Sequence, residues 1–250
     1  MALIKHGSFY KFSAAATKKA QADHAAIGAL QTFSDLREVT RTVQPVPINF
    51  HTSNAPRGLA LKSIKLTKGF EGFLQSLFNR TNEVFFLSWA WDLSGNPPVK
   101  YPGLGAEPQS CIIPLQVGQV RQFLGSGILL SPARTITAGL AVRIMLWESD
   151  QGERDFGKTM TEVANTLKTS ELTNLLALIA MGVVDVPVSI ITTVAAAAGE
   201  LAKAVGSILQ ANGDDYVDFY EGYYPSTDPW AAGDETHQGS ASEITLTRLP

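Results

Sequence analysis

The chain has 250 residues, of which 45% are hydrophobic and 17% are charged, and its formal net charge is −3. This length suits one large β domain with additions or two small domains. The low content of charged residues has two explanations: part of the surface is covered by a partner or by copies of the chain, or the fold is compact and rich in Ser, Thr, Gln and Gly. Because no block of Lys and Arg occurs, the electrostatic footprint of a nucleic-acid-binding protein is missing, and we exclude nucleic acid as a partner.

The cysteine content and the first residues leave the cellular compartment open. Cys111 is the one cysteine, so no intrachain disulfide can form, and its place in the apolar run Cys111-Ile112-Ile113 predicts a small buried side chain. Residues Met1 to Phe12 hold no apolar stretch long enough for a secretory signal. A cytoplasmic location and export by a non-classical route therefore both remain open.

The first fifth of the chain predicts a helical and extended arm. Residues Ser13 to Leu30 are rich in Ala and favour a helix that is only marginal alone. Asp35 to Pro47 is rich in β-branched residues and predicts an extended segment, and His51 to Gly58 is a polar loop. We therefore expect a helical and extended arm at 1–57 and a main domain at 58–250.

Strand patterns dominate the next part of the chain. The clearest is Ala141 to Trp147, in which Val142, Ile144 and Leu146 fall on one face of a strand of period two. The other expected strands cover residues 59–66, 83–91, 112–124 and 127–130.

The period changes from two to that of a helix at Thr159. Met160, Val163, Ala164 and Leu167 are helically spaced, and residues 172–179 form a nearly all-round apolar helix that ends near Gly182. A second long helix is predicted from Val188 to Gln210, with Asn212-Gly213 as its stop signal. Two such helices joined near residues 185–187 would form a hairpin at about 159–212.

Strand chemistry returns after the helices, at Asp215 to Tyr220 and at Glu243 to Thr247. Strands on both sides of a helical stretch indicate that the helices are inserted in, or packed on, a single sandwich. The predicted fold class is therefore mainly β with added helices (α+β): an antiparallel β-sandwich with an apolar helical hairpin inserted late in the chain.

The stretch from Leu140 to Gly157 combines a strand with an acidic turn that contains Glu148, Asp150, Glu153 and Asp155. Several carboxylates projecting from one tight loop repel one another unless a hard cation lies among them, although a solvated acidic turn gives the same pattern. Ca²⁺, which takes six to eight oxygen ligands, is the cation that such loops suit.

This acidic stretch resembles the third calcium-binding loop of C2 domains, in which a strand ends in an acidic residue and is followed by an Asp and then by an Asp, a hydrophobic residue and a Gly. Asp155-Phe156-Gly157 carries the end of that pattern. Residues 66–69 and 81–87 are similar to an early strand of the family and to the segment that follows it.

The resemblance implies a C2-like antiparallel sandwich of a kind that often binds membranes through Ca²⁺. It further implies that the metal ligands are Glu148, Asp150, Asp155 and Asn82, with Asn82 standing where the family has an aspartate. A second acidic group (Asp214, Asp215, Asp218 and Glu221) favours a solvated turn, but the two groups would share a cation site if both lay at one end of the sandwich.

The apolar hairpin raises a separate question, because a helix that is hydrophobic all round must be buried in protein or in lipid. Each of its uncharged runs, 175–184 and 186–199, is too short to span a bilayer alone. Three modes of burial remain open: packing on the sandwich and the N-terminal helix, packing between protomers of a homo-oligomer, and insertion into a membrane as in pore-forming toxins.

Catalytic patterns are missing from the sequence. The four histidines are scattered, no nucleophile elbow or phosphate-binding glycine loop occurs, and Trp89, Trp91 and Trp147 are more typical of a sandwich core than of a substrate groove. We therefore expect a non-enzymatic binding module, calcium-dependent if the acidic turn holds Ca²⁺, that engages a membrane surface or a protein partner. The alternatives are a pore-forming toxin and a structural subunit of a homo-oligomer.

Overall fold

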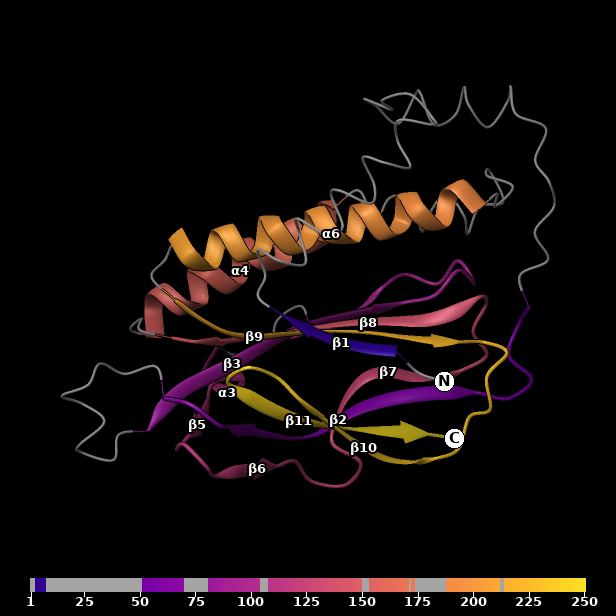
Figure 1. Cartoon of the computed structure of the whole chain (residues 1–250). Coiled ribbons are helices and arrows are strands. Elements are labelled where there is room, and N and C mark those ends of the chain that lie inside the picture. Colours follow the sequence, from indigo (N-terminus) through magenta and orange to yellow (C-terminus); the bar gives the residue numbers. More distant parts are fainter. Residues whose placement is uncertain are drawn as a thin grey trace.

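The computed structural model describes residues 3–7, 51–69, 81–103, 108–149, 153–170, 172–173, 188–211 and 214–250. Within these residues, two antiparallel sheets face each other, and two long helices cover the outer face of one sheet (Figure 1). The elements are β1 (Leu3–Gly7), β2 (Arg57–Leu66), β3 (Asn82–Trp91), β4 (Val99–Tyr101), α3 (Pro108–Cys111), β5 (Ile113–Leu115), β6 (Val120–Gln122), β7 (Ile128–Arg134), β8 (Gly139–Glu148), α4 (Glu153–Thr169), α6 (Val188–Ala211), β9 (Asp215–Pro225), β10 (Gly233–Gln238) and β11 (Ser242–Leu249).

The two sheets are built from neighbouring antiparallel strands. In the described part of the chain, the sheet beneath the helices has the order β1-β9-β8-β3-β4, with β5 also paired to β3. The second sheet has the order β10-β11-β2-β6, with β7 also paired to β2. Both β6 and β7 therefore lie along one side of β2, which places the segment between them at the outer edge of the second sheet (Figure 1).

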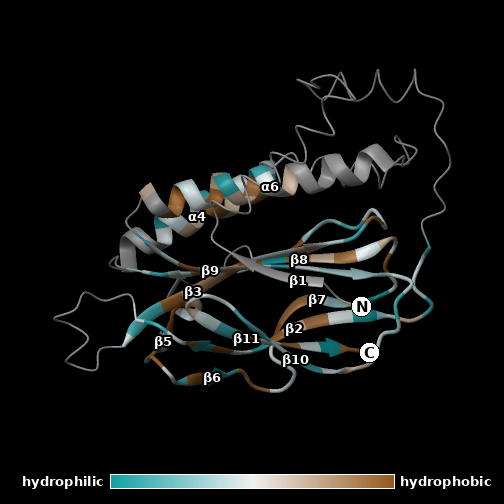
Figure 2. Cartoon of the chain, viewed as in Figure 1, coloured by the Kyte–Doolittle hydropathy of each residue, from teal (hydrophilic) through white to brown (hydrophobic). Residues whose placement is uncertain are grey.

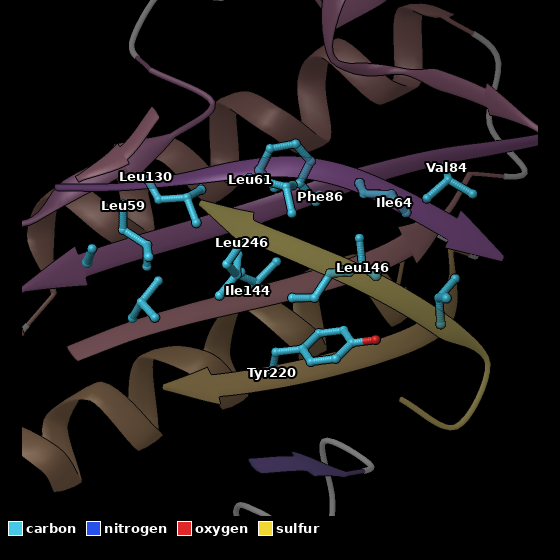
Figure 3. Close-up of a cluster of buried hydrophobic side chains, with 14 of the residues drawn as sticks. Leu59, Leu61, Ile64, Val84, Phe86, Leu130, Ile144, Leu146, Tyr220 and Leu246 are labelled. Atoms are coloured by element: carbon cyan, nitrogen blue, oxygen red, sulfur yellow. The ribbon is translucent and has the colours of Figure 1, made fainter. Parts of the chain in front are cut away.

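The core between the sheets follows from the two-residue period of the strands. Ile144 and Leu146 of β8 point inward together with Phe86 of β3, and they meet Leu61 and Leu246 of the second sheet (Figure 3). All of these side chains are buried. The alternation that predicted the strand at Ala141 to Trp147 therefore directs one set of its side chains into the core of the sandwich.

A second apolar layer lies between the first sheet and the helices, and it buries the outer face of this sheet. The outward side chains of β3 and β8 include Trp89 and Trp147, and Val205 and Leu209 of α6 pack against the same cluster. Leu172 is also buried in this layer. The helix side chains that belong to this layer are thus covered by the sandwich itself, which answers the burial question for those residues.

Most strand predictions are confirmed, as is the coarse fold class of antiparallel β-sheets with added helices. The second helix ends at Ala211, next to the expected stop signal. The first begins at Glu153 instead of Thr159, because an acidic first turn already suits the positive end of a helix dipole. No helix among the described residues is long and apolar enough to cross a membrane.

Some predictions fall wholly or partly outside the described residues. The Ala-rich segment Ser13 to Leu30 does so, as do residues 174–187 between the two helices. Of the predicted arm, residues 3–7 form β1, which pairs with β9 at the edge of the first sheet.

Candidate functional site

The ends of three strands meet at one end of the first sheet. Glu148 at the end of β8 lies opposite Val84 of β3 and opposite Asp215 of β9. Asn82 precedes Val84 by two residues, so it lies on the same face as Glu148 as its diagonal neighbour. We call this group of Asn82, Glu148, Asp214 and Asp215 the acidic strand end.

The polar side chains described at the acidic strand end are buried. Asn82 is 2% exposed, Glu148 is 3% exposed and Asp214 is 4% exposed. The Asn82 Nδ2 donates a hydrogen bond to the Leu115 carbonyl oxygen at 3.2 Å, but the Asn82 Oδ1 is buried without a hydrogen-bond partner among the described residues. A buried oxygen without a donor is unfavourable, and a hard cation is one way to satisfy it.

The four ligands expected from the C2 resemblance are only partly brought together. Asn82 and Glu148 are diagonal neighbours on adjacent strands, Asp150 lies outside the described residues, and Asp155 falls in the first turn of α4 instead of in an extended acidic loop. In the described ranges, no three His, Cys, Asp or Glu residues gather closely enough to hold a metal ion. The described side-chain oxygens, from the carboxylates of Glu148 and Asp214 and the amide of Asn82, are of the type that Ca²⁺ binds, but they are fewer than the six to eight ligands that it takes.

The second acidic group divides between two roles. Asp215 lies opposite Glu148 at the acidic strand end, and Asp214 precedes it in the chain. Asp218 is fully buried between the sheets, so the solvated turn expected there is wrong for this residue. Glu221 accepts hydrogen bonds from the Arg143 guanidinium on the neighbouring strand.

A different feature, which the sequence did not single out, lies along the outer edge of the second sheet. Val117 and Val120 are each 52% exposed, and Leu124 is 96% exposed. Figure 2 shows hydrophobic (brown) segments next to hydrophilic (teal) ones at β6 and beside it. We call residues 116–127, which hold these three side chains, the β6 ridge.

The backbone of the β6 ridge is held by hydrogen bonds on both sides of β6. The Gln119 amide donates to the Gln116 carbonyl at 3.0 Å, and the Gly127 amide donates to the Leu124 carbonyl at 3.0 Å. The Phe123 amide donates to the Lys62 carbonyl of β2 at 2.9 Å. The exposed aliphatic side chains therefore project from ordered turns.

The β6 ridge is surrounded by more basic than acidic side chains. No Asp or Glu occurs between residues 108 and 147, and none occurs between residues 57 and 69. The basic residues on and beside the ridge are Lys62, Lys65, Lys68 and Arg121, and the acidic residues on the adjoining strands are Glu83 and Glu243. The acid-free run from 108 to 147 is the sequence signal that could have indicated this surface.

The side chains considered for catalysis lie in the core. Trp89 and Trp147 are fully buried beneath the helices, and Trp91 is 6% exposed in the same layer. Cys111 is buried there as predicted, and burial raises the pKa of its thiol, which keeps it protonated.

Comparisons with known proteins give little further information. No family model matches the chain, and no curated protein matches it. Among solved structures, the chain is similar to human GIVD cytosolic phospholipase A2 in complex with methyl gamma-linolenyl fluorophosphonate inhibitor and terbium chloride. The TM-score is 0.31 and the sequence identity is 6%, and the match covers 80% of this chain and 17% of the phospholipase chain. We derive no function from a likeness this weak.

Proposed function

We propose that the chain is a non-enzymatic binding module that engages a membrane surface and holds Ca²⁺ at the acidic strand end. In this proposal the fold is a C2-like sandwich, and α4 and α6 form a helical hairpin that covers its first sheet. The two facing antiparallel sheets and the packing of α6 on the sheet support this architecture.

The observation that carries the proposal is the juxtaposition of Asn82 and Glu148 on adjacent strands, with the Asn82 Oδ1 left without a donor. In the proposed site, Asn82, Glu148 and Asp214 hold the cation, and Asp150 is the candidate for a further oxygen ligand. When bound, Ca²⁺ would offset the negative charge of the carboxylates and so reduce their repulsion of anionic groups outside the protein.

A calcium titration of the full chain tests the metal part of the proposal. Added Ca²⁺ binds the folded chain and not the unfolded one, so the melting temperature of the wild type should rise with Ca²⁺ concentration. The Glu148→Gln variant, which loses one ligand charge, should show little or no rise. Mg²⁺ at the same concentrations should have a smaller effect, because it demands stricter octahedral geometry and gives up its waters reluctantly.

The matched control for Glu148→Gln is Glu200→Gln, because Glu200 lies on the exposed face of α6 and pairs only with Lys203 one turn away among the described contacts. This variant should keep the full response to Ca²⁺. A wild type whose melting temperature ignores Ca²⁺ would remove the metal from the proposal. Equal responses of Glu148→Gln and the wild type would remove Glu148 from the site.

A further inference from the structure

The β6 ridge holds aliphatic side chains that the described part of the fold leaves half or more exposed. A single exposed leucine is common on protein surfaces, but Val117, Val120 and Leu124 are at least half exposed within one short segment. Leu124 is almost completely exposed although its turn is fixed by hydrogen bonds. Side chains presented in this way are available to a partner without rearrangement of the backbone.

The composition of the ridge favours lipid over protein as that partner. Protein interfaces concentrate their binding energy in Trp, Tyr and Arg, whereas the three most exposed side chains here are aliphatic. Aliphatic side chains gain free energy in an acyl layer in proportion to the apolar area that they bury, and basic residues at the same depth add attraction to anionic headgroups.

The charges around the ridge fit an anionic surface. Lys65 lies directly opposite Val120, and Arg121 is exposed on the next residue of β6. The Lys62 ammonium donates to the Gly125 carbonyl at 2.5 Å, which holds this cation beside Leu124. Glu243, on the strand that pairs with the other side of β2, lies opposite Lys65 and offsets part of this positive charge. The basic residues still outnumber the acidic ones around the exposed aliphatic side chains of the ridge.

The ridge begins at the acidic strand end. The Asn82 side chain donates to the Leu115 carbonyl on β5, and the turn with Val117 follows directly. A cation held by Asn82 and Glu148 would therefore lie close to the start of the ridge, whose later residues run through β6 to Leu124.

We propose that the β6 ridge is the lipid-contacting surface of the chain: Leu124, Val120 and Val117 enter the headgroup–acyl boundary of an anionic membrane while Lys62, Lys65, Lys68 and Arg121 contact its phosphate-bearing headgroups. This inference deepens the proposed function and rests on it, because it names the surface and the class of lipid that the binding module uses.

The test is co-sedimentation of the full chain with phosphatidylcholine vesicles that contain or lack phosphatidylserine, in Ca²⁺ and in chelator. The Leu124→Ser variant should weaken binding about tenfold or more, since the burial of one leucine side chain is lost. Each neutralised basic residue, as in Lys62→Gln or Arg121→Gln, should weaken binding about fivefold to phosphatidylserine vesicles and less to pure phosphatidylcholine.

Two control variants separate the ridge from general effects. Leu124→Met keeps the apolar side chain and should bind like the wild type. Lys203→Gln removes a charge from α6, which covers the other sheet, and should also bind like the wild type. Leu124 is almost fully exposed, so its variants should fold with unchanged melting temperatures.

The outcomes distinguish this inference from the proposed function. If the wild type sediments with no vesicle in either condition, engagement of membranes fails as a whole. If the wild type binds but Leu124→Ser binds equally well, the chain uses another surface and the ridge inference is overturned. If Leu124→Ser instead dissociates a dimer of the wild type and leaves vesicle binding unchanged, the ridge contacts a second copy, which also overturns the inference.

Discussion

The carboxylate of Asp218 on β9 accepts a hydrogen bond from the hydroxyl of Ser242 on β11, 2.6 Å away, and thereby joins the two sheets of the sandwich. The same carboxylate accepts hydrogen bonds from the Ser240 amide, the Ser240 hydroxyl and the Ala241 amide, at 2.8–3.0 Å. The neighbouring Tyr220 hydroxyl contacts Ser242 as well. Asp218 therefore fixes the turn between β10 and β11 against the opposite sheet.

Replacing this carboxylate should lower stability strongly. Asp218→Asn puts an amide group where donors converge from Ser240 and Ser242, so at least one buried donor loses its acceptor. We expect a loss of about 2–4 kcal/mol in the free energy of unfolding, measured by urea denaturation. The control Asp234→Asn alters an exposed carboxylate that accepts the Thr247 hydroxyl and should change stability by about 0.5 kcal/mol or less. Equal stability of the two variants would contradict a structural role for Asp218.

The same turn leaves no room for a side chain at Gly239. A Cβ added there would lie 2.4 Å from the Asp218 Oδ2 and 2.6 Å from the Tyr220 hydroxyl oxygen. Gly239→Ala should therefore destabilise the chain by about 1–3 kcal/mol, because the clash displaces groups that are hydrogen-bonded and buried. Gly103→Ala is the matched control, since a Cβ at that position meets nothing within 4 Å. Thermal unfolding of both variants would decide the point, and a neutral Gly239→Ala would show that the turn can move away from Asp218.

The sequence predicted the strands whose inner faces are apolar and missed those that carry no such pattern. Strand β11 alternates Ile244 and Leu246 with polar residues and was expected, and both side chains fill the core. Its neighbour β10 reads Gly-Asp-Glu-Thr-His-Gln and has no apolar residue to mark it. It forms a strand because β11 offers a free edge with which it can pair, and such pairing is a tertiary effect.

The candidate site was predictable only in part, for a similar reason. Glu148 and Asn82 were named from a local pattern, but only the strand register shows that they are diagonal neighbours. The exposure of Leu124 was hidden because periodicity cannot tell an apolar side chain that faces the core from one at a turn. The donors that hold Asp218 lie 22–24 residues farther along the chain, beyond the reach of any local motif.

Alkaline pH should destabilise the fold through Tyr101. Burial, with a smaller contribution from Cys111, raises the pKa of Tyr101 from 10.0 to about 12. A group whose pKa is higher in the folded state contributes stability that is complete below its unfolded pKa and is lost as the pH rises through the folded one. The wild type should therefore lose stability between pH 10 and about 12.

The variant that isolates this effect is Tyr101→Phe, which keeps the ring stacked on Phe86 at 4.2 Å between centroids. Tyr220 and Tyr224 also have raised pKa values, so the variant should keep part of the alkaline loss. The informative quantity is the urea midpoint of the wild type minus that of the variant. This difference should become smaller, or change sign, above pH 10, because only the wild type loses stability through Tyr101. Parallel pH profiles would mean that Tyr101 ionises as freely in the folded chain as in the unfolded one.

The packing of α6 on the first sheet can be tested by truncating one buried side chain. Leu209 is fully buried in the layer that also contains Trp147, so Leu209→Ala should leave a cavity and lower the free energy of unfolding by about 2–5 kcal/mol. Ser207→Ala, two residues earlier on the exposed face of α6, removes only a hydrogen bond to the Lys203 carbonyl and should change stability by about 0.5 kcal/mol or less. Urea denaturation of both variants measures the difference. If Leu209→Ala were as stable as Ser207→Ala, the apolar face of α6 would not be buried against the sheet in solution, and the cover for this helix would have to be a second copy of the chain or a membrane.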